Sequence, residues 1–430
     1  MKKLIIGILL LPLGSLHAQV KDSLALPAII QEVTQNHPAV KAAGEALRKA
    51  DARVGLAQTG YLPDVDVSAN YSNVGPVPEL TFEPMGTFKL FPNNNYSATL
   101  NVRQTIYDFG RTKTTIETEK LNKTMDLQAL EQVRQKIAQA AIAGFYSLCY
   151  LQEAVKIKKE QLKVLDEHLA FVQKKKETGS ATDYEILATQ VKASIVESQL
   201  MDLEAALTIQ QSAMNTLLGL PVGNPLLVKG AIDQEKPVNA GDTLFTSAFA
   251  NRSEMIMGRK KEDLATLRLL AVRDQNRPVI SFVFNGGAKN GYMPNLNKIK
   301  PNYAVGAGIR VPIFDANRTK FNVLQAESSI KSTQLEIEQT GRVITGEIVE
   351  SETNMKTASR KIQLFELQLS QAKRAYALAE INFRAGAITN LDLLDAENSV
   401  SDSRLMLVKA RIDLAVCNYR FLAAIGKKFY

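Results

Sequence analysis

The side chains best suited to catalysis are scarce in this chain of 430 residues. The histidines are His17, His37 and His168, and no H-E-x-x-H motif of a zinc hydrolase is present. The two cysteines, Cys149 and Cys417, form no C-x-x-C pair that could hold zinc or a redox disulfide. No acid, base and nucleophile converge in the sequence. We therefore expect no enzyme, no cofactor and no metal, with His168 on the surface of a helix and both cysteines packed as small apolar residues.

A basic stretch is the next feature that could carry chemistry. Glu153, Glu160 and Glu167 interrupt it, which is typical of a solvated helix face rather than of a nucleic-acid site. Its lysines are Lys156, Lys158, Lys159, Lys163 and Lys174 to Lys176.

The start of the chain predicts export from the cytoplasm. Lys2 and Lys3 precede an apolar run and then small residues up to Ala18, the pattern of a signal peptide over residues 1–18. The formal charge of +8 would fall to +6 without those two lysines. No later apolar run reaches 18 residues, so a membrane could be crossed only by β-strands.

The remainder of the chain is an internal duplication. The phrase IYDFGRTK at 106–113 recurs as IFDANRTK at 313–320, an offset of 207 that also pairs Gly179 with Gly386. We expect a first repeat at 19–219, a linker at 220–239 and a second repeat at 240–430, all within one continuous protomer. The first repeat has a longer loop at about 72–95.

Each repeat begins with a helical segment, at about 23–60 and 240–276, which a proline ends. In the first of these segments Asn36 is expected to cap a helix near Pro38. Two alternating segments follow in each repeat, and their period of two predicts half-buried strands. These strands are expected at 64–71, 96–106, 279–286 and 303–313.

Two long helices complete each repeat. The stretch from Arg111 to about Glu177 contains no proline, and its helix would be roughly 100 Å long. Apolar residues in the second repeat are spaced 3-4-3-4, which predicts a coiled-coil seam. Thr182 with Glu185, and Thr389 with Asp392, are expected to form capping boxes that open the return helices. The seam residues are Ile362, Phe365, Leu369, Ala372, Tyr376, Ala379 and Phe383 on one helix and Leu405, Val408, Ile412, Ala415, Tyr419 and Leu422 on the other.

Four strands cannot close a barrel, and an open strand edge in lipid would leave backbone groups unpaired. If the strands span a membrane, several chains must therefore combine them. The expected fold class is an all-α coiled-coil stem plus a membrane β-barrel.

These features together resemble the TolC family of outer-membrane efflux proteins. The resemblance rests on VRQTIYDFGRTK and IRVPIFDANRTK and on the hairpin ends KKETGSATDYEILATQ and NFRAGAITNLDLLDAEN. It implies a homotrimer with a 12-stranded barrel in outer-membrane lipid and a stem in the periplasm. The implied function is a passive exit duct of a tripartite efflux pump, with a periplasmic adaptor and an inner-membrane transporter, proton-driven or ABC, as partners.

The resemblance also implies site residues at the hairpin ends. Asp392 and Asp395 match acids that ring the closed periplasmic mouth, and Glu185 is the repeat equivalent of Asp392. A Tyr and an Arg that lock the closed state in the family are replaced by Phe383 and Ile388, so the same latch is not expected. The adaptor would dock on Gly179, Ser180, Gly386 and Ala387.

Two alternatives remain open at this point. A type I protein-secretion duct would use the same architecture, and the sequence does not separate it from an efflux duct. A periplasmic coiled-coil scaffold with a small β-domain would need no barrel.

Overall fold

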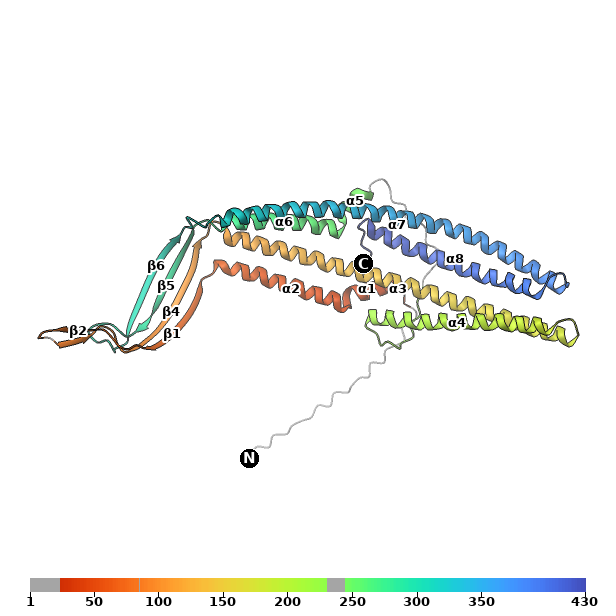
Figure 1. Cartoon of the computed structure of the whole chain (residues 1–430), viewed down its shortest axis with the longest axis horizontal. Coiled ribbons are helices and arrows are strands. Elements are labelled where there is room, and N and C mark those ends of the chain that lie inside the picture. The colour runs from red at the N-terminus through yellow and green to blue at the C-terminus, as the bar shows by residue number, and fades with distance from the viewer. Residues whose placement is uncertain (1–23, 85, 230–243) are drawn as a thin grey trace, which may run out of the picture.

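A computed structural model describes residues 24–84, 86–229 and 244–430. The expected signal peptide at 1–18 and the second half of the expected linker at 220–239 lie outside these ranges. The described chain is elongated, with a β-sheet at one end and long helices running away from it (Figure 1). Among the described residues, no helix combines the length and apolar composition needed to cross a membrane.

The first half of the chain begins with two helices that meet at His37. The His37 side chain accepts a hydrogen bond from the Ala39 amide at 3.1 Å and so caps the second helix. The expected cap, Asn36, is wrong, because Asn36 is still the last residue of the preceding helix. The elements of this half are α1 (Leu26–Asn36), α2 (Pro38–Gln58), the short 3₁₀ helix η1 (Thr59–Tyr61), β1 (Asp64–Asn73), β2 (Glu79–Phe82), β3 (Gly86–Lys89), β4 (Asn94–Tyr107), α3 (Arg111–Glu177) and α4 (Asp183–Leu218).

The second half has a similar order of elements. Positive-φ backbone recurs at the 207 offset, for example at Gly110 and Asn317 before the long helices. The last predicted strand lies three residues earlier than expected and ends at Arg310, because Pro312 has no N–H to continue the ladder. The elements of this half are α5 (Leu244–Asn251), α6 (Ser253–Asp274), β5 (Val279–Lys289), β6 (Lys300–Arg310), α7 (Arg318–Arg384) and α8 (Asn390–Ala424).

The main sheet is antiparallel, with strand order β1-β4-β5-β6. Its register places apolar residues opposite one another across the strands, as in Val67 opposite Leu100 and Phe284 opposite Val305. On β4 the apolar side chains of Tyr96, Ala98 and Leu100 are exposed, whereas Ser97 and Thr99 on the polar face are half-buried. The described helices lie beyond one end of the sheet and leave this apolar face uncovered, whereas a water-soluble sheet packs its apolar face on a core (Figure 1).

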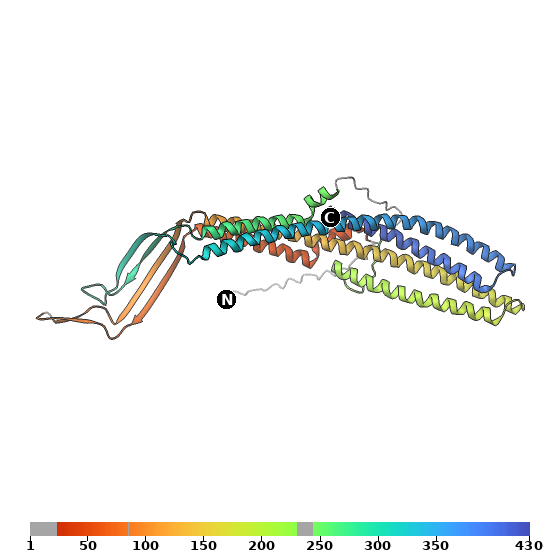
Figure 2. The same cartoon turned by 45° about the horizontal axis from the view of Figure 1, so that its top comes forward.

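The loop expected at 72–95 contains a second sheet. The β2–β3 hairpin pairs Leu80 with Phe88 and projects beyond the main sheet, away from the helices (Figures 1 and 2). Its strands were missed because each is only four residues long, too short for a period of two to stand out.

The stem is a wall in which each helix packs on its neighbours. Near the sheet the order is α2, α3, α6 and α7, and toward the far end it is α4, α3, α8 and α7 (Figure 1). The helices α3 and α7 each contain 67 residues, as the proline-free stretches predicted. The predicted seam is confirmed in part. All of its residues are buried or half-buried, and Ile362 packs with Leu422 between α7 and α8. Ile412, Ala415 and Tyr419 on α8 instead pack in the core that α3 forms.

The largest apolar core lies at mid-stem. There Phe145 and Leu148 on α3 pack against Ile29 on α1 and Ala415 on α8. Cys149 is buried in this core, which raises the pKa of its thiol to about 11 through desolvation. Both cysteines are free thiols, and the packing role predicted for Cys149 is confirmed.

Candidate functional site

The two helical hairpins, α3–α4 and α7–α8, end side by side at the tip of the stem (Figure 1). Each turn is made by a glycine in the left-handed region, Gly179 with φ 79° and Gly386 with φ 75°. The amides of Ser180 and Ala387 donate back to carbonyls five residues earlier, each at 2.8 Å. The predicted glycine caps are therefore confirmed, and they leave these turn residues exposed.

Both predicted capping boxes are present at the start of the return helices. Thr182 and Glu185 exchange backbone-to-side-chain hydrogen bonds at 3.3 Å. The Thr389 amide donates to Asp392 at 2.9 Å, and the Asp392 amide donates to the Thr389 hydroxyl at 3.2 Å. The Thr389 hydroxyl and amide hydrogen bonds lower the pKa of Asp392. Asp392 is therefore a fixed, exposed anion at the hairpin end.

Asp395 lies one turn further along α8 and is paired across the hairpins. Its carboxylate accepts from the ammonium of Lys192 on α4 at 3.1 Å, and 62% of its side chain remains exposed. Glu185 is half-buried at the start of α4, where its backbone carbonyl accepts from the Asn390 side chain at the start of α8 at 3.2 Å. The hairpin ends thus bring together all three acids that the sequence singled out, with Asp392 and Asp395 the more exposed.

His168 is not a surface residue, contrary to expectation. It lies on α3, half-buried, with Nε2 2.6 Å from the Asn390 side-chain oxygen on α8. The Asn390 amide group donates to Thr189 at 3.0 Å and to the Glu185 carbonyl at 3.2 Å. With its nitrogen already donating, Asn390 must accept from His168, which places a proton on Nε2. Seam spacing alone could not reveal this contact, because its partners come from three helices.

Phe383 and Ile388, the two positions where the resemblance led us to look for a polar latch, lie in an apolar junction between the hairpins. Phe383 is buried against Val172 on α3, with Ile388 packed beside it. The ammonium of Lys175 lies 4.7 Å from the centre of the Phe383 ring, a cation–π contact between the hairpins. Packing therefore occupies the place where a Tyr and an Arg would form polar contacts.

Lys158 is the exception in the basic stretch, which was expected to be solvated throughout. It is only 4% exposed and donates to Gln161 at 2.8 Å, while Gln161 donates to Glu397 on α8 at 2.9 Å. Desolvation lowers the pKa of Lys158 and raises the pKa of Glu397. The sequence carried a signal for this site, because Lys158 occupies a coiled-coil seam position where apolar residues are the rule.

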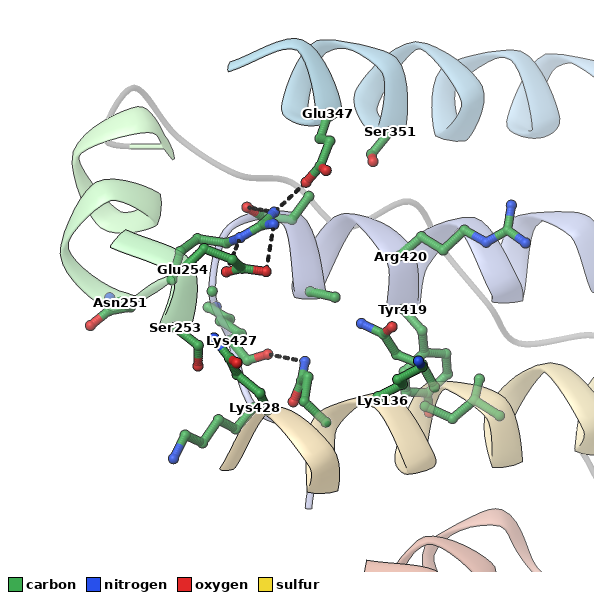
Figure 3. A pocket seen from close by; sticks show the side chains of 18 of the residues that line it. Lys136, Asn251, Ser253, Glu254, Glu347, Ser351, Tyr419, Arg420, Lys427 and Lys428 are labelled. Atoms are coloured by element: carbon green, nitrogen blue, oxygen red, sulfur yellow. Dashed lines mark hydrogen bonds and ion pairs between the residues drawn. The ribbon is translucent and has the colours of Figure 1, made fainter. Parts of the chain in front are cut away.

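A separate cavity of about 790 Å³ lies at mid-stem, between α3, α7 and the end of α8 (Figure 3). Arg252 projects into it but is held by Glu254 at 3.0 Å and Glu347 at 2.6 Å. Within the described ranges, no cluster of three or more His, Cys, Asp or Glu side chains is placed to hold a metal.

The sequence profile of the outer membrane efflux protein family matches residues 29–220 and 244–427. Among relatives, the outer membrane efflux protein BepC of Brucella suis is 18% identical over 99% of this chain and 90% of its own. The toluene efflux pump outer membrane protein TtgC of Pseudomonas putida is 24% identical over 78% of this chain and 70% of its own. The alkaline protease secretion protein AprF of Pseudomonas aeruginosa is 22% identical over 77% of this chain and 70% of its own.

Solved structures agree on the fold. The channel CusC superposes with a TM-score of 0.80 at 19% identity, covering 94% of this chain and 92% of its own. VceC from Vibrio cholerae superposes with a TM-score of 0.77 at 20% identity, covering 94% of this chain and 97% of its own. With its helical stem, its antiparallel sheet and a family profile matched over most of its length, the chain belongs to the outer membrane efflux protein family.

Proposed function

We propose that three copies of this chain close end to end into a duct through the outer membrane, as the exit component of a tripartite efflux pump. The observation that carries the proposal is that the two lateral edges of the protomer differ and are open. One edge consists of β1 with α2 and α4, and the other of β6 with α7. Unlike edges associate head to tail, which generates a closed ring where the rotation between copies closes.

The strand directions suit such a closure. Because β1 follows α2 and leaves the stem while β6 returns to α7, a β6-to-β1 contact between copies is antiparallel, like every pair in the main sheet. Three copies would supply 12 strands and leave no free edge in lipid.

The helical edges carry apolar side chains that suit the same contact. On α4, Leu187 and Val191 are each 59% exposed, and on α7, Leu364 and Leu378 are 59% and 63% exposed. Side chains of this size on the edges of a wall favour burial against another helix. In the ring, α4 of one copy faces α7 of the next.

The sheet faces indicate which side meets lipid. Val67, Val305 and Ile309 on the apolar face are at least 60% exposed. On the other face Asn101 donates to Asp66 at 2.7 Å, which suits the wall of a water-filled channel.

At the far end of the stem, the three copies would place Asp392 and Asp395 around one opening, with Glu185 behind them. A ring of carboxylates attracts cations and resists anions. The turns at Gly179, Ser180, Gly386 and Ala387 are the proposed contacts for a periplasmic adaptor, which would link the duct to an inner-membrane transporter.

The cargo is proposed to be small molecules. Export of proteins by a type I system is the second candidate, because relatives such as AprF are named for protease secretion. No step in either function requires catalysis by this chain.

Single-channel recording tests the duct directly. The full-length protein, extracted from outer membranes in detergent, should migrate as an oligomer and conduct ions in a planar bilayer. A water-soluble monomer without conductance would contradict the duct and favour the periplasmic scaffold.

A further inference from the structure

The β2–β3 hairpin has one apolar face that the rest of the described chain leaves uncovered. Leu80, Phe82 and Phe88 lie on this face and are 46%, 55% and 42% exposed. On the opposite face, the hydroxyls of Thr81 and Thr87 lie 2.9 Å apart. An isolated two-stranded hairpin is marginally stable in water, so a covering surface would stabilise it.

The position of the hairpin argues against lipid as that surface. It lies beyond the end of the main sheet, where Tyr71 and Tyr96 stand opposite each other with ring centres 5.2 Å apart (Figure 2). Two residues further outward, on the same face, are Asn73 and Asn94, whose side chains share a hydrogen bond at 2.7 Å. Tyrosines followed by amides mark the passage from a membrane interface into water, so the hairpin stands in water.

The chain's own β5–β6 loop, residues 290–299, does not cover this face. Asn290 ties that loop to β4, accepting from the Tyr96 amide at 2.8 Å and donating to the Asn94 carbonyl at 2.6 Å. In this position Met293 and Ile299 of the loop are themselves 60% and 58% exposed. Two exposed apolar surfaces therefore remain at the same end of the protomer.

The ring of the proposed function brings these two surfaces together. The hairpin leaves the sheet from β1, one lateral edge, and the 290–299 loop leads into β6, the other edge. When β6 of one copy pairs with β1 of the next, its 290–299 loop arrives on the β1 side of the hairpin.

We propose that the apolar face of the β2–β3 hairpin packs on the 290–299 loop of the adjacent copy. Leu80, Phe82 and Phe88 would contact Met293 and Ile299 of that copy. The charges also match, because Glu83 and Lys298 are exposed and have no ion-pair partner among the described residues. Each copy then gives one such contact and receives one, which fastens the outer end of the ring. This inference rests on the proposed ring, whereas the ring could form without it.

Disulfide cross-linking tests the contact in the full chain. In a Cys149→Ala, Cys417→Ala background, the Phe82→Cys, Met293→Cys pair should oxidise in the outer membrane. Most of the chain should then shift to dimer and trimer bands on a non-reducing gel and return to monomer on reduction. The matched control is Thr81→Cys with Met293→Cys, which places the thiol on the opposite face of the hairpin and should leave most of the chain monomeric.

Native gels of the same unoxidised samples separate this proposal from the ring itself. Oligomers on the native gel without the Phe82–Met293 cross-link would overturn the hairpin contact and leave the duct standing. Dimer bands from the Phe82→Cys variant alone would show that the hairpins contact each other, which would also overturn the hairpin–loop contact. Equal cross-linking of the Thr81→Cys, Met293→Cys control would overturn it as well. Monomers on the native gel would overturn both.

Charge reversal gives a second, independent measurement. Glu83→Lys or Lys298→Glu alone should lower the temperature at which the oligomer dissociates, and the double variant should restore it. Additive losses in the double variant would contradict the proposed pairing of these charges.

Discussion

The Lys192 ammonium on α4 lies 3.1 Å from the Asp395 carboxylate on α8, so a cation on one hairpin is paired with an anion on the other. Asp392, one turn closer to the tip, is instead held by its own capping box. The two acids proposed for the mouth therefore differ in how freely they could meet a passing ion.

Removing both acids should weaken block of the channel by divalent cations. Asp392→Ala with Asp395→Ala would remove six negative charges from a trimeric mouth, and the cation concentration needed for half block should rise several-fold. Asp413→Ala, an exposed acid on α8 distant from the tip, is the control and should leave block unchanged. Equal block in the double variant would remove these residues from the constriction.

Lys192→Ala should act in the opposite direction. Without the Lys192 ammonium, no positive charge offsets the Asp395 carboxylate. Divalent cations should therefore block the channel at lower concentration. An exposed ion pair contributes only about 0–1 kcal/mol, so the stability of the protein should change little. Single-channel recordings and thermal unfolding of the same sample measure both expectations.

Asn390→Ala should destabilise the stem by about 1–3 kcal/mol, because it leaves His168 and Thr189 without their buried partner. Asn398→Ala is the control, since Asn398 is only half-buried and bonds mainly within α8. In a double-mutant cycle, His168→Ala should lower the free energy of unfolding less in the Asn390→Ala background than in the otherwise unchanged chain. Fully additive losses would show that the contact carries no coupling energy.

Gly386→Ala should destabilise by about 1–2 kcal/mol, because alanine is strained at a φ of 75° although the space around it is open. Gly44→Ala provides the contrast. Gly44 lies inside α2 in equally open space, so the substitution should stabilise by about 0.5–1 kcal/mol. Equal effects at both sites would contradict the assigned backbone conformation.

Acid should weaken the start of α7. Hydrogen bonds from the Thr319 hydroxyl and amide, and from Asn276, lower the pKa of Asp315 to about 2. A depressed carboxyl pKa stabilises the folded state above its unfolded value near 4 and loses that contribution as the pH falls toward 2. Thermal midpoints of detergent-purified protein should therefore fall over this range, and less steeply in Asp315→Asn.

The sequence by itself determined the long helices and the points at which the return helices begin. Proline-free stretches defined α3 and α7, the 3-4 spacing defined buried positions on α7 and α8, and Thr182 and Thr389 defined the starts of α4 and α8. These features could be read because helix length, amphipathic spacing and capping act between residues near in sequence.

Only the tertiary structure decided which side chains meet across helices. His168 was expected on the surface and Lys158 in solvent. Instead His168 is half-buried beside Asn390, and Lys158 is almost fully buried 3.8 Å from Asp402, both partners lying on α8 more than 200 residues away. The β2–β3 hairpin and the pairing of Lys192 with Asp395 also depend on how strands and hairpins come together. Sequence spacing determines which face of a helix a residue occupies, but the fold determines what lies opposite that face.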